Sequence, residues 1–266
     1  MSKYNLYSLL NSIKRQSRCI LAISIIIVMC ACNGDNVPDC FQNAGDLVRQ
    51  SYQTADFNTI TVFENLNLVI KQGSEFKVEV ETGEFLVDEI SAVVEGDRLV
   101  LRNENACNFV RPYGLTTFFV TAPNIEQIRS STGLLISSDG VLNYPNLSLI
   151  SESFIEPDAA TTDGSFNLNV ASQSLSIVVN GIAYFQVQGT TEDFNVTIAA
   201  GDSRIEAVQL ISQNVNLNHR GSNDVIINPQ QSITGIIRGT GNVISIKRPP
   251  IVEVEEQFNG RLIYLD

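Results

Sequence analysis

The chain has 266 residues, of which 44% are hydrophobic and 17% charged, so it holds enough apolar material for a sizeable core and is not expected to be disordered. Its formal charge is −12, and an acidic surface repels phosphate backbones, so nucleic acid is not an expected partner. A single His excludes a His-based metal cluster and leaves few groups for acid–base catalysis near neutral pH.

Residues 1–31 have the layout of an export signal. Four positive charges and no negative one accompany an apolar run of about eleven residues that extends from Cys19 to Met29. A helix that spans a bilayer needs about 20 apolar residues, so this run is short for a membrane span. An uncleaved N-terminal membrane helix is the alternative interpretation.

The residues that follow the apolar run resemble a bacterial lipoprotein signal, in which a Cys behind small residues is lipidated and becomes the mature N-terminus. Cys32 follows Ala31 and fits this pattern better than Cys30, which follows the bulky Met29. We therefore expect a signal peptide over residues 1–31, lipidation of Cys32, and anchoring in the bacterial cell envelope at the periplasmic or surface face of the outer membrane. Without the four positive charges of residues 1–31, the formal charge becomes −16.

Cys40 and Cys107 are the cysteines that remain once Cys32 carries a lipid. Export brings them into an oxidising compartment, where a disulfide between them would tie the N-terminal segment to the first part of the folded domain. Two independent thiols are the alternative, because sequence spacing does not determine the distance between them. The mixed, polar composition of residues 32–56 indicates a tether.

From Phe57 onward the chain alternates apolar and polar residues over short runs separated by Gly, Asn, Asp and Pro. A period of two residues is typical of strands with one buried face. The longest helical candidate, residues 85–94, is only about ten residues long. The pattern predicts a single all-β domain over residues 57–266, whose first strands are expected at residues 60–63, 66–70, 76–81, 98–102 and 116–120.

Four glycines recur every 20 residues in the second half of the chain: Gly181, Gly201, Gly221 and Gly241. A fixed period of this length is typical of a solenoid, whose turns bury their apolar faces by stacking on one another. Glycine suits the corners of such a coil because it adopts positive φ at little cost. We therefore expect a parallel β-helix of about 20 residues per turn with these glycines at its corners. A β-sandwich, whose turn signals also recur, is the alternative.

The order of several short segments resembles the head GIN domain family of auto-transporter adhesins. The resemblance covers about residues 57–264, although Asn180-Gly181, Ala200-Gly201 and Arg220-Gly221 stand where the family usually has Ser-Gly. It implies that the β-helix is right-handed, that the protein is exported, in many members as a lipoprotein, and that it acts in adhesion. The segments are residues 57–62, 69–73, 76–80, 95–101, 119–128, 237–243 and 250–252.

Candidate catalytic residues are few. We interpret His219 as a solvated corner residue, because no Gly-x-Ser-x-Gly elbow accompanies it. Asp163, Asp193, Asp202 and Asp224 lie near predicted corners, where they could supply the paired carboxylates of a glycoside hydrolase or a Ca²⁺ site. Solvation of exposed corners is the interpretation we favour for them. The phosphate-binding and dinucleotide-binding glycine patterns are missing, so no cofactor is expected.

Arg102, Arg111 and Arg129 have no acidic companions in the sequence that would indicate a site. We assign no catalytic, cofactor-binding or metal-binding residue. The sequence favours a non-enzymatic, lipid-anchored envelope protein that binds a surface polysaccharide or a protein partner along an elongated β-helix. A carbohydrate-active enzyme on the same scaffold, either a polysaccharide lyase or a hydrolase, is the alternative. A structural module that spaces other envelope components is a third hypothesis.

Overall fold

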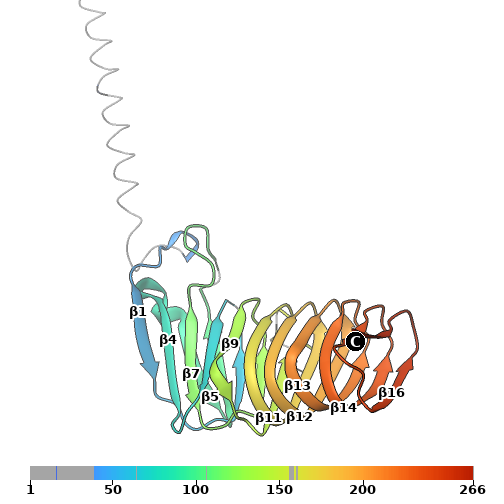
Figure 1. Cartoon of the computed structure of the whole chain (residues 1–266). Coiled ribbons are helices and arrows are strands. Elements are labelled where there is room, and N and C mark those ends of the chain that lie inside the picture. Colours follow the sequence, from blue (N-terminus) through green and yellow to red (C-terminus); the bar gives the residue numbers. More distant parts are fainter. Residues whose placement is uncertain are drawn as a thin grey trace, which may run out of the picture.

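The computed structural model describes residue 16 and residues 39–63, 65–105, 107–155, 159 and 161–265. Its strands join one 17-stranded sheet, and Figure 1 shows an elongated body with β1 at one end and β16 near the other. In the described ranges, no helix has the length and hydropathy to cross a membrane. The short 3₁₀-helices are η1 (Asp39–Phe41) and η2 (Glu84–Glu89), and the strands are β1 (Leu47–Tyr52), β2 (Thr59–Val62), β3 (Asn67–Gln72), β4 (Lys77–Gly83), β5 (Ile90–Glu95), β6 (Arg98–Asn103), β7 (Thr117–Ala122), β8 (Gln127–Ser130), β9 (Leu135–Leu142), β10 (Asn146–Ser151), β11 (Ser165–Gly181), β12 (Tyr184–Gly201), β13 (Arg204–His219), β14 (Val225–Ile237), β15 (Val243–Ser245), β16 (Ile251–Glu256) and β17 (Leu262–Tyr264).

The first half of the sheet mixes strand directions. β4 pairs antiparallel with both β1 and β7, and β5 pairs antiparallel with β6. The tight turn between β5 and β6 contains Gly96 at a φ of +69°, a conformation that costs glycine little. β2 instead pairs parallel with β6 and β8. β3 likewise pairs parallel with β7 and β9. Because β1 pairs with β4, the tether expected over residues 32–56 is part of the sheet from Leu47 onward.

The second half of the sheet is parallel, and its strands pair in register through columns of apolar side chains. One column contains Phe166, Phe185, Ile205, Val225 and Val243, each of which is buried and paired with the next. The rings of the first two stack with their centroids 4.6 Å apart. Burial of each such side chain stabilises the fold by about 1.5–3 kcal/mol, so the columns form one continuous core.

The all-β prediction is confirmed, but the prediction of a right-handed parallel β-helix over residues 57–266 is wrong. The strands form a nearly closed, barrel-like sheet of mixed orientation, in which β4 lies antiparallel between β1 and β7. The physical reason is that alternation of apolar and polar residues reports which face of a strand is buried and carries no information about strand direction. The tight turn at Gly96 reverses the chain where a coil would have continued in the same sense.

Glycines at strand ends allow neighbouring strands to approach closely, and Gly201 provides a test. Its φ is +93°, and a Cβ atom there would lie 2.1 Å from the backbone oxygen of Gly181. Gly140 has a similar φ of +89°, but nothing lies within 4 Å of its Cβ position. We expect Gly201→Val to lower the free energy of unfolding by about 3 kcal/mol or more, and Gly140→Val to lower it by about 1–2 kcal/mol through backbone strain alone. Urea denaturation measures both values, and equal losses would contradict the close approach at Gly201.

Candidate functional site

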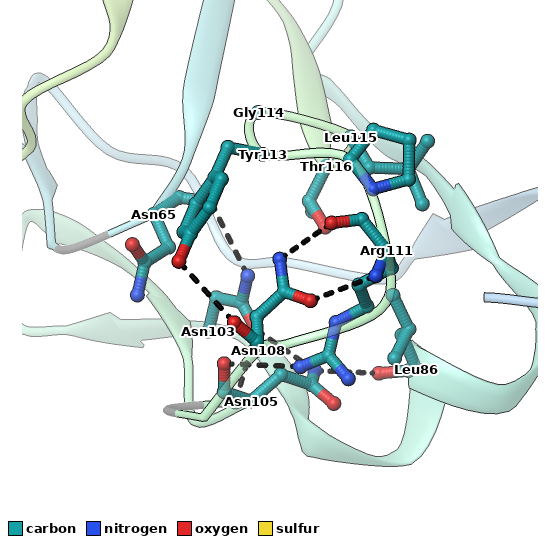
Figure 2. A pocket seen from close by; sticks show the side chains of 11 residues that line it. Asn65, Leu86, Asn103, Asn105, Asn108, Arg111, Tyr113, Gly114, Leu115 and Thr116 are labelled. Atoms are coloured by element: carbon teal, nitrogen blue, oxygen red, sulfur yellow. Dashed lines mark hydrogen bonds between the residues drawn. The ribbon is translucent and has the colours of Figure 1, made fainter. Parts of the chain in front are cut away.

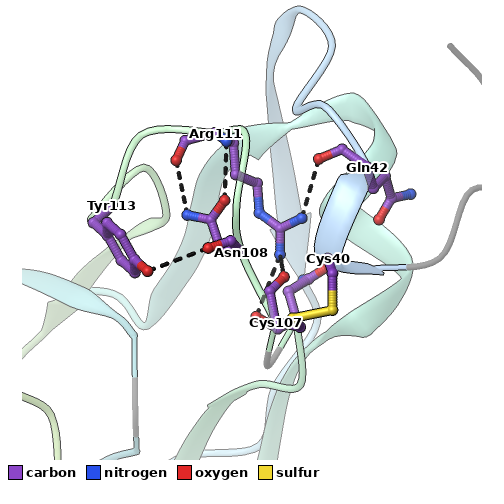
Figure 3. Close-up of a disulfide and its surroundings, with 7 residues drawn as sticks. Cys40, Gln42, Cys107, Asn108, Arg111 and Tyr113 are labelled. Atoms are coloured by element: carbon purple, nitrogen blue, oxygen red, sulfur yellow. Dashed lines mark hydrogen bonds between the residues drawn. A yellow bond between two sulfur atoms is a disulfide. The ribbon is translucent and has the colours of Figure 1, made fainter. Parts of the chain in front are cut away.

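A disulfide between Cys40 and Cys107 joins η1 to the loop between β6 and β7. Figure 3 shows that the Arg111 side chain reaches across the same loop. Its guanidinium donates hydrogen bonds to the backbone oxygens of Gln42 at 3.2 Å and Cys107 at 2.9 Å. Arg111 therefore links the two segments that the disulfide also joins, and its role is to hold this loop together.

A small polar pocket lies beside this loop, and Figure 2 shows that amide side chains fill most of it. Asn108 donates to the backbone oxygen of Arg111 at 2.8 Å, and Asn105 donates to Leu86 O at 3.0 Å and to Asn103 Oδ1 at 2.8 Å. The free volume is about 40 Å³, which is room for a few water molecules. The pocket is a hydrogen-bonded part of the loop and is too small for an organic ligand.

His219 is fully buried, so the interpretation of this residue as a solvated corner is wrong. It pairs with Ile198 and Ile237 in a buried column of the sheet, and its Nδ1 accepts a hydrogen bond from the backbone N–H of Gly221 at 3.3 Å. Burial lowers the pKa of His219, and hydrogen bonds to the backbone of Asn223 and Gly241 offset this only in part. The alternation of apolar and polar residues along β13 is the sequence signal that could have predicted a buried imidazole at this position.

The lowered pKa of His219 makes stability depend on pH in a predictable direction. The unfolded chain takes up a proton on this His near pH 6.5, whereas the folded chain resists protonation until a lower pH. We therefore expect the free energy of unfolding to fall as pH drops below about 6.5, by up to about 1.4 kcal/mol per pH unit. Urea denaturation between pH 7.5 and 5 measures the slope, and a His219→Leu variant should lack this component. Identical slopes in the two proteins would contradict it.

The carboxylates singled out from the sequence do not gather in one place. Asp193 accepts a hydrogen bond from Asn214 at 3.1 Å, Asp202 from the Ser222 hydroxyl at 2.7 Å, and Asp224 from the backbone N–H of Asn242 at 2.9 Å. Within the described residues, no three His, Cys, Asp or Glu side chains form a group that could hold a metal ion. These three carboxylates therefore serve as acceptors between neighbouring strands or between the turns that follow them.

Arg129 has the acidic partner that its sequence neighbours do not reveal. Its guanidinium lies 2.6 Å from Glu152 Oε1, and both side chains are buried. Burial by itself would raise the pKa of Glu152, but the hydrogen bonds from Arg129 and from the backbone of Phe154 and Ile155 hold it below the usual value. Arg102 lies over the Phe63 ring at 3.6 Å from its centroid. Both arginines are thus part of the folded framework.

The predicted corner glycines lie along one edge of the sheet, which we call the glycine edge. The backbone N–H of Asp202 donates to Gly181 O at 2.8 Å, that of Ser222 donates to Gly201 O at 2.9 Å, and that of Gly241 donates to Gly221 O at 3.1 Å. The first three glycines of this line therefore each contact the corner that follows in the chain.

A surface hollow of about 540 Å³ lies on the glycine edge, and we call it the glycine-edge hollow. It combines backbone atoms of glycines with two arginines, three polar side chains and two exposed apolar ones. The sequence pattern predicts Gly201, Gly221 and Asp202 at corners, but only strand register brings the arginines together. The lining residues are Ile182, Gly201, Asp202, Arg220, Gly221, Ser222, Arg238, Gly239, Thr240 and Phe258.

The chain belongs to the head GIN domain family, because the sequence model of the family described as "Putative auto-transporter adhesin, head GIN domain" matches residues 56–249. This match confirms the family resemblance seen in the sequence. A search of curated proteins found no match.

Solved structures share the fold at low sequence identity. A "putative adhesin" from Bacteroides fragilis aligns with a TM-score of 0.73 and 18% identity, over 84% of this chain and 99% of its own. A "putative lipid binding protein" from Parabacteroides distasonis aligns with a TM-score of 0.58 and 13% identity, over 84% and 98% of the two chains. A "putative adhesin" from Parabacteroides merdae has a TM-score of 0.58 and 14% identity, over 84% and 97%. At these identities the likeness concerns the fold.

Proposed function

We propose that this head GIN domain protein is a non-enzymatic adhesin of the bacterial cell envelope, held at the outer membrane by a lipid on Cys32. Membership of a family described as adhesins and the export signal over residues 1–31 support this function. The observation that carries it is the glycine-edge hollow, an open surface hollow of about 540 Å³ that combines two exposed arginines with an exposed aromatic ring.

One end of the sheet suits attachment to the membrane, and the later strands suit binding of a ligand. Cys40 is bonded to Cys107, and Cys32 lies outside the described residues, only eight positions before Cys40. Eight residues span at most about 28 Å, so a lipid on Cys32 would keep this end near the bilayer. Phe109 and Tyr113 are 74% and 80% exposed on the loop between β6 and β7, which the disulfide attaches to η1, and such side chains favour the interface between membrane and water. The glycine-edge hollow lies on the later strands, where a ligand outside the membrane could reach it.

The hydrogen bonds of the corner carboxylates support a binding role over catalysis. Asp193, Asp202 and Asp224 each contact an amide, a hydroxyl or a backbone N–H on a neighbouring strand or turn. A glycosidase needs two carboxyl groups that face one scissile bond. The structural role of these acidic groups fits a protein that holds its ligand without changing it.

The lipid anchor can be tested at its attachment residue. Cells that express the full chain with Cys32→Ala should incorporate no labelled palmitate into it, and the protein should leave the membrane fraction, because the thioether that would carry the lipid cannot form. Cys30→Ala is the matched control and should retain both labelling and fractionation. Unchanged labelling of the Cys32→Ala chain would reject the assignment.

The adhesin function can be tested by binding without turnover. The full chain, purified in a mild detergent, should bind a defined subset of a glycan array and leave the bound glycans intact, as mass spectrometry of the eluted sugars would show. Cleavage of a bound glycan would replace the adhesin with a carbohydrate-active enzyme. A chain that bound neither glycans nor extracellular-matrix proteins would overturn the proposed function.

A further inference from the structure

We propose that the glycine-edge hollow binds a carboxylate-bearing polysaccharide, a polyuronate, through Arg220 and Arg238. This ligand class rests on the proposed adhesin function and specifies what that adhesin recognises. The hollow offers two neighbouring guanidinium groups, the backbone of Gly201 and the exposed ring of Phe258. Each of these can contact a different part of an acidic sugar.

Arg220 and Arg238 are neighbours on adjacent strands. The register pairs His219 with Ile237, so the two arginines that follow them lie side by side where β13 and β14 end. Both are exposed, and in the part of the chain that the structure describes neither guanidinium forms an ion pair or a side-chain hydrogen bond. Like charges directly opposite each other on neighbouring strands destabilise a sheet. Their adjacency in a chain with a formal charge of −12 therefore indicates a site for an anion.

Other arginines of this protein have carboxylate partners, and this contrast distinguishes the pair. Arg98 lies 2.8 Å from Glu95, Arg204 lies 2.8 Å from Glu206, and Arg261 lies 3.5 Å from Glu256. With 29 acidic residues against 17 basic ones, an arginine on this surface is easily neutralised from within the chain. The hollow keeps two guanidinium groups available for a partner instead.

The spacing of the two arginines suits a polymer of acidic sugars. Neighbouring strands lie about 4.8 Å apart, which is close to the length of one pyranose residue along a polysaccharide chain. A guanidinium group presents a planar fork that binds a carboxylate through two parallel hydrogen bonds. Arg220 and Arg238 can thus hold one carboxylate between them or the carboxylates of successive sugars.

The rest of the hollow accommodates the body of a sugar ring. Gly201 is exposed and lines the hollow with backbone atoms, beside the buried Gly221 and Gly239. Phe258 is 55% exposed at the rim and offers an apolar face to the C–H side of a pyranose. Asp202 can accept a hydrogen bond from a sugar hydroxyl while its charge repels a carboxylate, which orients the acidic group of the ligand toward the arginines.

The backbone at this edge favours a glycan over an acidic peptide. A peptide that adds to a sheet needs unpaired N–H and C=O groups on an exposed strand edge. The corner carbonyls are already engaged, since Gly201 O accepts from the N–H of Ser222 at 2.9 Å and Gly221 O accepts from the N–H of Gly241 at 3.1 Å. Recognition must therefore use the side chains of the rim, as sugar binding does.

The test compares polygalacturonate with its fully methyl-esterified form, which has the same backbone without the charge. Isothermal titration calorimetry on the detergent-purified full chain should detect the acid and show at least tenfold weaker binding of the ester. Arg220→Gln together with Arg238→Gln should weaken binding of the acid at least tenfold. Arg220→Lys together with Arg238→Lys should bind more tightly than the double Gln variant, because lysine keeps the positive charge but lacks the planar fork. Phe258→Ala should also weaken binding.

Arg98→Gln is the matched control, because it removes a partly exposed arginine that lies outside the hollow and should leave affinity unchanged. All these side chains are at the surface, so thermal unfolding should show that each variant is folded. Equal binding of acid and ester, or full affinity in the double Gln variant, would overturn the polyuronate site. Tighter binding of poly-glutamate than of polygalacturonate would overturn it in favour of an acidic protein partner.

The outcomes separate this inference from the adhesin function on which it rests. If the wild-type chain adheres to glycan arrays and the double Gln variant adheres equally well, the adhesin function stands and the arginine site falls. If the wild-type chain fails to bind polygalacturonate but binds neutral glycans, the ligand class is wrong and the adhesin function is retained. If the wild-type chain binds neither glycans nor extracellular-matrix proteins, both the ligand class and the adhesin function are overturned.

Discussion

In-register pairing of half-buried strands is the interaction on which the rest of this protein depends. A strand of the sheet cannot bury its apolar face alone, and each one completes its core contacts through the next. Phe166 stacks on Phe185, and Ile205, Val225 and Val243 continue the column, so that a shift of one residue in any strand would turn its apolar side chains toward solvent. The register is therefore strongly specified, and it also determines which exposed residues become neighbours.

Glycines at the strand ends make this register possible, and some of them also line the glycine-edge hollow. At Gly201 the backbone approaches Gly181 so closely that no Cβ atom fits between them. At Gly201 the lack of a side chain also leaves the backbone exposed, where a ligand can approach the sheet. The glycine that close strand packing requires at this position thus also lines the glycine-edge hollow.

Charge is distributed unevenly around the glycine-edge hollow. The acidic side chains of the corners form hydrogen bonds with neighbouring turns: Asp202 with Ser222, and Asp224 with the backbone of Asn242. Arg220 and Arg238 face solvent beside them. In a chain with an excess of negative charge, the repulsion of an acidic polymer elsewhere on the surface would confine it to this hollow. Specificity would then come as much from the acidic surroundings as from the arginines.

The sequence by itself determined the all-β class, the family and the glycines that line up along one edge, because alternation and turn residues act over a few neighbouring positions. Its period of about 20 residues recurs where β11 to β14 pair, but it did not reveal that β1, β4 and β7 pair antiparallel. Strand direction depends on which distant segments meet across the core, and local patterns do not encode that. Likewise, the burial of His219, the partner of Arg129 and the adjacency of Arg220 and Arg238 were decided by the tertiary structure. Each depends on the register between strands, which is settled only when the whole sheet packs at once.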